Sequence, residues 1–286
     1  MDKVTVARTA GFCFGVKRAV NLVYEETEKG SGPIYTWGPI IHNEQVVSDL
    51  SQRGVGILTE EDIEKGLPSQ GTVIIRSHGV SKACLEALSK SGMTVRDATC
   101  PFVAKIHDIV REHSLMGEPI VIIGNPRHPE VEGIRGWVEG ECRVISGEED
   151  IDSLRTLENR RLCVVSQTTF NHEKFLKLVE KIKSLRYDTI VLNTICNATK
   201  ERQSEAETLS EQSDIMLVVG SRSSSNTQKL YDICKAHCDD TYYIQTLGDL
   251  VTVHFCSDSR VGITAGASAP NNIIQEVFSY VRRSKF

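Results

Sequence analysis

Short runs of aliphatic and β-branched residues alternate along the chain with segments of helical periodicity. The runs are apolar at every position, which is typical of strands buried on both faces of a parallel sheet. A glycine- or serine-rich turn and then a helix-like segment follow each run. The pattern therefore predicts an α/β fold made of parallel strands. The five clearest predicted strands lie at 73–75, 120–123, 162–165, 215–219 and 261–264.

A threefold repeat appears in the polar residues that follow the predicted strands. Cys13, Cys100 and Cys196 each lie at a turn that leads into a helix-like segment, and two further polar turns follow each cysteine in the same order. This recurrence predicts three similar α/β units of about 90 residues in a pseudo-threefold arrangement. Their functional groups would gather at the carboxyl ends of the strands. The expected organisation is an N-terminal strand over 1–12 and units over 13–99, 100–195 and 196–286.

Composition narrows the class of protein. The 286 residues include 40% hydrophobic and 25% charged residues, and the formal net charge is −5. An acidic balance argues against general nucleic-acid binding. Because no apolar run approaches the roughly 20 residues of a membrane span, and the N-terminus lacks a signal-peptide core, we expect a cytoplasmic protein.

Nine cysteines in a long chain are not a disulfide framework. Cys13, Cys100 and Cys196 stand out because the start of a helix stabilises a thiolate. Three thiolates suit zinc or an iron–sulfur cluster. Zinc usually takes a fourth protein ligand from close-spaced pairs, and a cubane cluster with three cysteines leaves one iron open. The others, which we expect to be buried filler, are Cys84, Cys142, Cys163 and Cys256. Cys234 and Cys238 lie four residues apart on a predicted helix and could bind a metal, but no second ligand pair accompanies them, so we expect filler there too.

A second set of polar residues is suited to an anion. Serine-rich and small-residue turns ahead of a helix present backbone N–H groups and a positive dipole end, and histidines add further donors. Each turn taken alone is more often a helix cap or a packed side chain. Their recurrence at equivalent positions favours a phosphate-binding ring. Its members would be His42, His78, His128, Ser224, Ser225, Asn226 and Ser268.

Glu130 and Thr168 are the candidate catalytic residues. Glu130 lies two residues after His128, where a bound phosphate would raise the pKa of its carboxyl group. A carboxyl group that keeps its proton at neutral pH can deliver it to a substrate. Thr168 is placed to orient a substrate hydroxyl group or a water molecule.

Seven stretches together resemble the 4-hydroxy-3-methylbut-2-enyl diphosphate reductase family. The resemblance runs in order along nearly the whole chain, and the set is specific although each motif alone is weak. The stretches are Gly-Phe-Cys-Phe-Gly-Val from residue 11, Ser-His-Gly-Val from 77, Asp-Ala-Thr-Cys-Pro from 97, His-Pro-Glu-Val-Glu-Gly from 128, Ser-Gln-Thr-Thr from 166, Ser-Ser-Asn from 224 and Thr-Ala-Gly-Ala-Ser-Ala-Pro from 264.

The resemblance implies a trefoil of three α/β domains around one [4Fe-4S] cluster. Cys13, Cys100 and Cys196 would hold this cluster and leave one iron open. It implies reductive dehydroxylation of an allylic diphosphate to isopentenyl and dimethylallyl diphosphates, the last step of the non-mevalonate isoprenoid pathway. The eight substrate contacts would be the seven ring residues and Thr168, with Glu130 delivering protons. Ferredoxin or flavodoxin would supply electrons to a monomeric enzyme.

Two other functions are compatible with the residues alone. A non-redox iron–sulfur hydro-lyase would also use an open iron, and a zinc or cluster protein could be purely regulatory.

An acidic electron donor requires a local basic patch despite the net negative charge. Candidates for it are Lys17, Arg18, Arg76, Lys200, Arg202 and Arg222.

Overall fold

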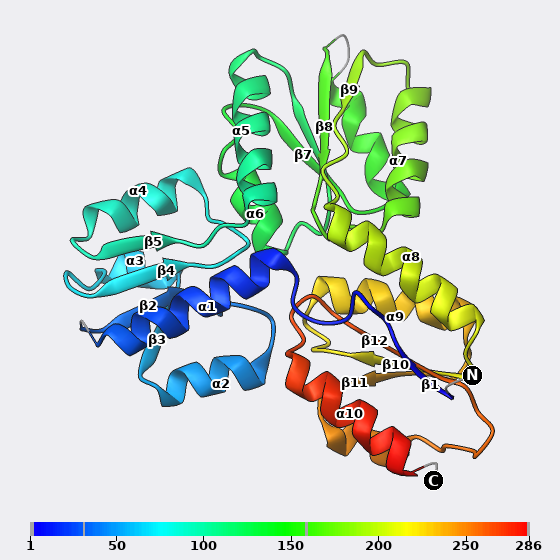
Figure 1. Ribbon diagram of the computed structural model, residues 1–286. Coiled ribbons are helices and arrows are strands. Elements are labelled where there is room, and N and C mark those ends of the chain that lie inside the picture. The colour runs from blue at the N-terminus through cyan, green and yellow to red at the C-terminus, as the bar shows by residue number, and fades with distance from the viewer. Residues whose placement is uncertain (1–2, 31, 158–159, 285–286) are drawn as a thin grey trace. The chain divides into compact units, whose positions relative to one another are not determined.

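The computed structural model describes residues 3–30, 32–157 and 160–284. It contains three four-stranded parallel sheets with helices packed against them, so the prediction of three α/β sheets is confirmed (Figure 1). The five strands predicted from the sequence are all present. By contacts within the chain it forms two compact units. The first comprises Met1–Val16, His42–Val46 and Asn197–Phe286, and the second Lys17–Ile41 and Val47–Cys196.

The first unit holds one sheet, in the order β1-β12-β10-β11. Its strands are β1 (Val4–Val6), β10 (Ile215–Val219), β11 (Thr241–Ile244) and β12 (Val261–Ala265). Its helices are α8 (Asn197–Glu211), α9 (Ser225–His237) and α10 (Asn271–Ser284), with a 3₁₀ segment η2 (Leu247–Thr252). The expected N-terminal strand over 1–12 includes residues 1 and 2, which lie outside the described residues.

The second unit holds two sheets, in the orders β3-β2-β4-β5 and β7-β6-β8-β9. The strands of the former are β2 (Ile34–Trp37), β3 (Val55–Leu58), β4 (Thr72–Ile75) and β5 (Thr94–Asp97). Those of the latter are β6 (Ile120–Ile123), β7 (Cys142–Ile145), β8 (Leu162–Ser166) and β9 (Thr189–Val191). The helical segments are α3 (Glu60–Lys65), α4 (Lys82–Lys90), α5 (Pro101–Leu115), α6 (Pro129–Arg135), α7 (His172–Ser184) and η1 (Glu148–Leu157). Helices α1 (Phe14–Lys29) and α2 (Glu44–Gln52) run from the first unit into the second.

The three sheets repeat one strand order. In each, the central strand β2, β6 or β10 has the next strand of the chain on one side and the following strand on the other. The fourth strand, which lies at the edge, is β5 in one sheet, β9 in another and β1 in the third. Cys100, Cys196 and Cys13 lie three, five and seven residues after the ends of these edge strands. The repeat is therefore structural, and the N-terminal strand completes the third copy.

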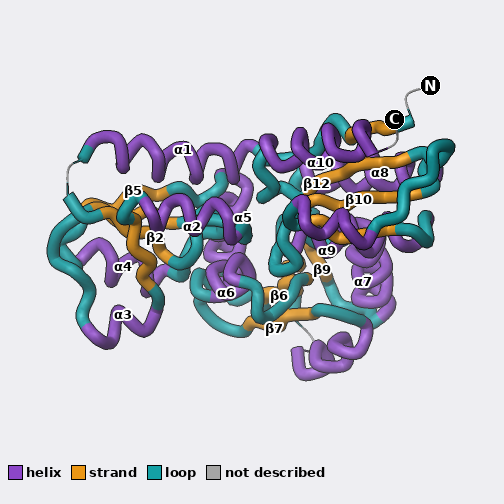
Figure 2. Tube along the Cα trace, turned by 90° about the horizontal axis from the view of Figure 1, so that it is seen from below, coloured by secondary structure: helices purple, strands orange, loops and turns teal. Residues whose placement is uncertain are grey.

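Alternation along the central strands builds a core on both faces of each sheet. In β10, Ile215, Leu217 and Val219 pack against α10, while Met216 and Val218 pack against α8 and α9. Helices α8 and α9 lie side by side over the same face (Figures 1 and 2). Successive strand residues point to opposite faces, so a strand covered on both sides must be apolar throughout. This explains the uninterrupted apolar runs.

The same arrangement holds in the sheet built on β6. Ile120 and Ile122 pack against α5 and α6, and Val121 and Ile123 pack against α7 and η1. All four side chains are fully buried. Among the described residues, no helix is long and apolar enough to cross a bilayer. The domain boundaries at 99/100 and 195/196 stay predictions.

Candidate functional site

One backbone hydrogen bond recurs at each of the three repeated cysteines. The amide N–H of Cys100 donates to the carbonyl of Ser77 at 3.0 Å, and that of Cys196 to the carbonyl of Thr168 at 3.2 Å. In the first unit the amide of Cys13 donates to the carbonyl of Ala267 at 3.4 Å. The acceptor in each case lies in the turn after the third strand of the sheet. The fold thus ties every candidate ligand to one of the predicted polar turns.

Each of the three cysteines also directly precedes a helix. Helices α1, α5 and α8 begin at Phe14, Pro101 and Asn197, one residue after the cysteine. The three residues are partly exposed. The N–H groups and the positive end of the helix dipole at such a position favour the binding of a negatively charged group. Three partly exposed sulfurs at helix starts therefore fit the donor set of an iron–sulfur cluster.

The other cysteines differ in burial. Burial raises the pKa of Cys84, Cys163 and Cys234 to about 12 and that of Cys142 to about 11. It also raises the pKa of Cys238. Such thiols stay protonated and pack as small apolar groups. Cys84, Cys163, Cys234 and Cys238 are buried, as expected, while Cys142 is only partly buried.

Cys256 is not buried, contrary to the expectation from the sequence. It is exposed in the loop that leads to β12, so the expectation that it is buried is wrong. Its neighbours Val253 and Phe255 contribute to the core and give the stretch an apolar character. Sequence alone could not show that Cys256 itself points away from that core.

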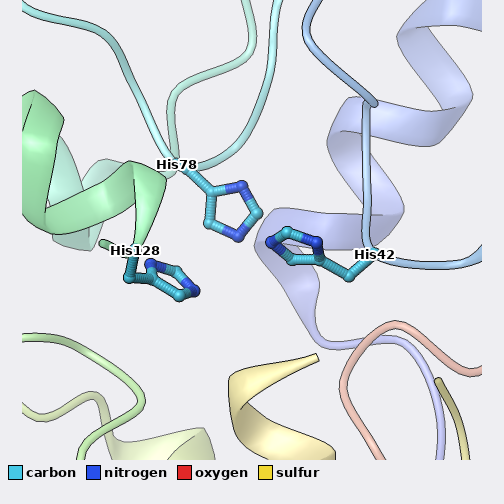
Figure 3. Close-up of side chains that lie close together, drawn as sticks. All are labelled: His42, His78 and His128. Carbon is cyan, nitrogen blue, oxygen red and sulfur yellow. The ribbon is translucent and has the colours of Figure 1, made fainter. Parts of the chain in front are cut away.

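His78 and His128 come together in the second unit. Their ring centroids lie 5.2 Å apart with the planes at 82° (Figure 3). His128 is buried and caps α6, where its Nδ1 accepts a hydrogen bond from the amide of Glu130 at 3.2 Å. In a neutral ring that leaves the proton on Nε2, which can donate to an anion. His42, also drawn in Figure 3, belongs to the first unit.

Glu130 and Thr168 are in direct contact. The carboxylate of Glu130 accepts from the Thr168 amide at 2.6 Å and from its hydroxyl group at 2.8 Å. Burial raises the pKa of Glu130 to about 7, although these two hydrogen bonds act in the opposite direction. From the sequence, a bound phosphate was the expected cause of a raised Glu130 pKa. Burial already provides it, so the acid is able to hold a proton near neutral pH before any ligand is considered.

In the first unit, buried polar groups gather where β10 and β12 end. Ser224, Asn226 and Ser268 are all buried, and Ser224 caps α9 by accepting from the amide of Thr227 at 3.4 Å. Neither amide atom of Asn226 has a hydrogen-bond partner among the described residues. A buried amide without a partner is costly, so it points to a bound polar ligand. Ser225 is the first residue of α9.

The glycine turns of the first unit bring backbone close to this cluster. Gly220 has a φ of 143°, and a Cβ there would lie 2.6 Å from the hydroxyl oxygen of Thr227. Only glycine fits such a close approach. Ser268 donates its hydroxyl hydrogen to the carbonyl of His42 at 3.2 Å, which joins the His42 segment to the turn after β12. The first unit therefore contains four of the predicted ring residues, which are Ser224, Ser225, Asn226 and Ser268. The last of these also donates to the backbone carbonyl of His42.

One basic residue, Arg202, is removed from the predicted patch, and a second, Arg76, is only partly exposed. Arg202 is buried, 4% exposed, and its guanidinium group is held by backbone carbonyls. Burial also lowers the pKa of Arg76, whose Nε is buried. Lys17 and Arg18 are exposed. Arginines are mostly exposed in folded proteins, so the burial of Arg202 and the partial burial of Arg76 could not be predicted from their residue type.

Comparison with known proteins identifies the family. The model of the family described as LytB protein matches residues 4–282. The chain belongs to this family. The resemblance inferred from the motifs is thereby confirmed. A relative from Thermoanaerobacter sp. (strain X514), named 4-hydroxy-3-methylbut-2-enyl diphosphate reductase, is 44% identical over 98% of this chain and 96% of its own length.

Two solved structures of such reductases are similar to this LytB chain. One, described as the terminal enzyme of the non-mevalonate pathway, is 39% identical with a TM-score of 0.71, over 98% of this chain and 99% of the other. The reductase from Plasmodium falciparum is 29% identical with a TM-score of 0.87, over 97% and 87% of the two chains. The three-sheet fold is therefore that of the LytB reductases.

Two buried groups of the second unit give this LytB chain opposing pH dependences. Burial lowers the pKa of His107, which stacks on Trp137, to about 4, while Glu130 titrates near 7. The unfolded chain protonates His107 below about pH 6.5, so the stability from its neutral form is lost as pH falls from there towards 4. The stability from protonated Glu130 is present below about pH 4.5 and is lost as pH rises through 7.

We predict that single variants will separate these two effects. Because a pKa unit corresponds to about 1.4 kcal/mol, each group should change the free energy of unfolding by about 3 kcal/mol across its window. The stability of Glu130→Gln relative to the parent chain should rise between pH 4.5 and 7. That of His107→Gln should fall between pH 4 and 6.5. Anaerobic urea unfolding at several pH values measures both.

The exposed Glu132, two residues along the same helix, provides the control. Glu132→Gln should differ from the parent chain by a constant amount over this range. A pH-independent difference for Glu130→Gln would show that Glu130 has an ordinary pKa in the folded protein.

Proposed function

We propose that this chain reduces 4-hydroxy-3-methylbut-2-enyl diphosphate to isopentenyl and dimethylallyl diphosphates. One allylic alcohol, two electrons and two protons give one alkene and one water. The C–O bond to the hydroxyl group breaks, and one new C–H bond forms at either end of the allyl system. The observation that carries the proposal is the link from Cys196 through Thr168 to Glu130, which joins a candidate metal ligand to a buried acid that can hold a proton.

The proposed cofactor is one [4Fe-4S] cluster bound by Cys13, Cys100 and Cys196. Their recurring position at helix starts, each tied to a polar turn, supports this ligand set. When bound, such a cluster supplies electrons and an iron without a protein ligand that can act as a Lewis acid.

Glu130 and Thr168 would handle the proton that the leaving hydroxyl group needs. A carboxyl group with a pKa near 7 is about half protonated at neutral pH, which suits a general acid. The Thr168 hydroxyl group, 2.8 Å from the carboxylate, would orient the substrate hydroxyl group and relay the proton. Water is kept from the acid because Glu130 is buried.

The diphosphate would be bound by groups that donate hydrogen bonds. His78, His128 and Asn226 provide ring or amide N–H groups, and Ser224 and Ser225 lie at the start of α9, where the helix dipole favours an anion. His42 and Ser268 complete the proposed set. Holding the charged end of the substrate fixes its allylic end, which lowers the entropic part of the barrier.

Electrons would come from an acidic carrier protein, ferredoxin or flavodoxin. The exposed Lys17 and Arg18 stand near the start of α1, and Arg18 also donates to the carbonyl groups of Asp97 and Thr99 just before Cys100. A cation in this place would attract an acidic partner. We also propose that the enzyme is monomeric and cytoplasmic.

The test is an anaerobic assay with the diphosphate substrate and a chemical one-electron reductant. We expect both isopentenyl and dimethylallyl diphosphate, with two electrons consumed for each product formed. No product should form when the reductant is left out. Turnover without reductant would instead support a hydro-lyase, and a protein with zinc and no sulfide would support a regulatory or structural site.

A further inference from the structure

Two charged side chains of α8 hold the loop that carries Cys13. The carboxylate of Glu205 accepts from the backbone N–H groups of Arg8 and Thr9, both at 2.8 Å, and from the Thr9 hydroxyl group at 2.6 Å. The guanidinium group of Arg202 donates to the Thr9 carbonyl at 2.9 and 2.5 Å and to the Gly11 carbonyl at 2.7 Å. Together they form what we call the α8 clamp.

The clamp combines one buried charge, Arg202, with one half-buried charge, Glu205. Arg202 is 4% exposed, and fully enclosed arginines are rare unless their charge is matched by hydrogen bonds. Burial favours the protonated form of Glu205, but the hydrogen bonds from Thr9 and Arg8 outweigh it and keep its pKa below the usual value. The carboxylate therefore stays charged and its hydrogen bonds stay strong.

Helix α8 has a small apolar contact surface, made by Ala206 and the partly buried Leu209 against β10 and α9. Its buried residues are mostly polar, and Ala206 is the only aliphatic one among them. On a helix with so small an apolar face, polar contacts contribute a larger share of the attachment. The clamp is therefore a principal attachment between α8 and the N-terminal segment.

The loop is fixed from its other side as well. Gly11 has a φ of 102°, and a Cβ there would lie 3.2 Å from the Ile274 side chain. The amide of Cys13 donates to Ala267 in the turn before α10. With carbonyls held by α8 and the cysteine amide held by this turn, the backbone leading to Cys13 has few ways to move.

Helix α8 connects two of the candidate cluster ligands. Its first residue, Asn197, directly follows Cys196, and Arg202 and Glu205 lie one and a half to two and a half turns further on. The same helix thus begins at one candidate ligand and grips the loop of another. We infer that Arg202 and Glu205 are positioning residues for the cluster. They hold the loop of Cys13 against the helix that begins directly after Cys196. This inference rests on the proposed iron–sulfur function.

The test compares Glu205→Gln and Arg202→Lys with the parent protein, all purified anaerobically. Glutamine keeps the shape of Glu205 but not its charge, and lysine keeps the charge of Arg202 but has one nitrogen in place of the two guanidinium nitrogens that donate to Thr9 and Gly11. Both variants should assemble iron and sulfide. Each should release iron to a chelator roughly tenfold faster than the parent protein, which corresponds to about 1.4 kcal/mol in the release barrier.

Hydrogen exchange of the peptide covering residues 3–13 supplies a readout independent of the cluster's chemistry. The amides of Arg8 and Thr9 should exchange faster in Glu205→Gln, because their acceptor is weakened. Glu201→Gln replaces an exposed acid on the same helix and should match the parent protein in both measurements.

A core variant separates positioning from general stability. Val277→Ala opens a cavity under α10 and lowers the melting temperature while leaving the clamp intact. If it releases iron as fast as the clamp variants do, or if the clamp variants keep the parent rate, the inference is overturned. A parent protein that binds no iron and sulfide would instead refute the proposed function on which the inference rests.

Discussion

Replacing Glu130 with glutamine should lower the rate of anaerobic reductive turnover by a factor of about 10² to 10⁴, the usual contribution of a general acid. Glutamine has nearly the same shape, and its amide oxygen can still accept from the Thr168 amide. Its NH₂ group can donate to the Thr168 hydroxyl oxygen in place of the present contact. The geometry should therefore survive, while the proton that leaves with the hydroxyl group has no donor.

Kinetics and spectroscopy together check this prediction. Iron and sulfide content and substrate affinity should stay close to the parent values, while kcat falls. The parent enzyme should lose activity as pH rises through about 7, since Glu130 then gives up its proton. The variant should lack this limb of the pH profile. Glu132→Gln, on the exposed side of α6, should behave like the parent enzyme. Full activity in Glu130→Gln would remove Glu130 from proton delivery.

The sequence predicts most of the framework because parallel strands leave a strong signal. The run at 120–123 is apolar at each position because both faces of β6 are covered. The spacing of Cys13, Cys100 and Cys196 also reflects a real structural repeat, since each follows an edge strand and donates to an equivalent turn. Local patterns of this kind are set by the chain itself, so they can be seen without coordinates.

Features that depend on tertiary enclosure could not be predicted in this way. The charge of Arg202 suggested an exposed basic patch, yet packing of α8 against the N-terminal loop buries it. The raised pKa of Glu130 was expected from a ligand, but burial beneath the Thr168 turn is its cause. In both cases the residue type is visible in the sequence, while its environment depends on segments far away along the chain. The sequence does place Arg202 on the helix that begins directly after Cys196, which indicates that it lies near a candidate ligand.

The largest effect is expected from the cysteines themselves. Cys13→Ser, Cys100→Ser and Cys196→Ser should each abolish the bound cluster, or reduce it to a small and labile fraction, because a serine hydroxyl group is a poor ligand for iron–sulfur iron. Iron and sulfide per chain, with the visible charge-transfer absorbance, measure the loss. Alanine at the same positions removes the remaining oxygen ligand and should make the loss complete.

The three cysteines occupy structurally equivalent positions, so substitution should have the same effect at each. All three cysteines precede a helix and donate to the turn after a third strand, so the three variants should lose the cluster to similar extents. Cys256→Ser alters an exposed cysteine and should keep a full complement of iron and sulfide. If one of the three variants kept a normal cluster while the other two did not, that residue would not be a ligand. The threefold pattern would then describe the fold but not the metal site.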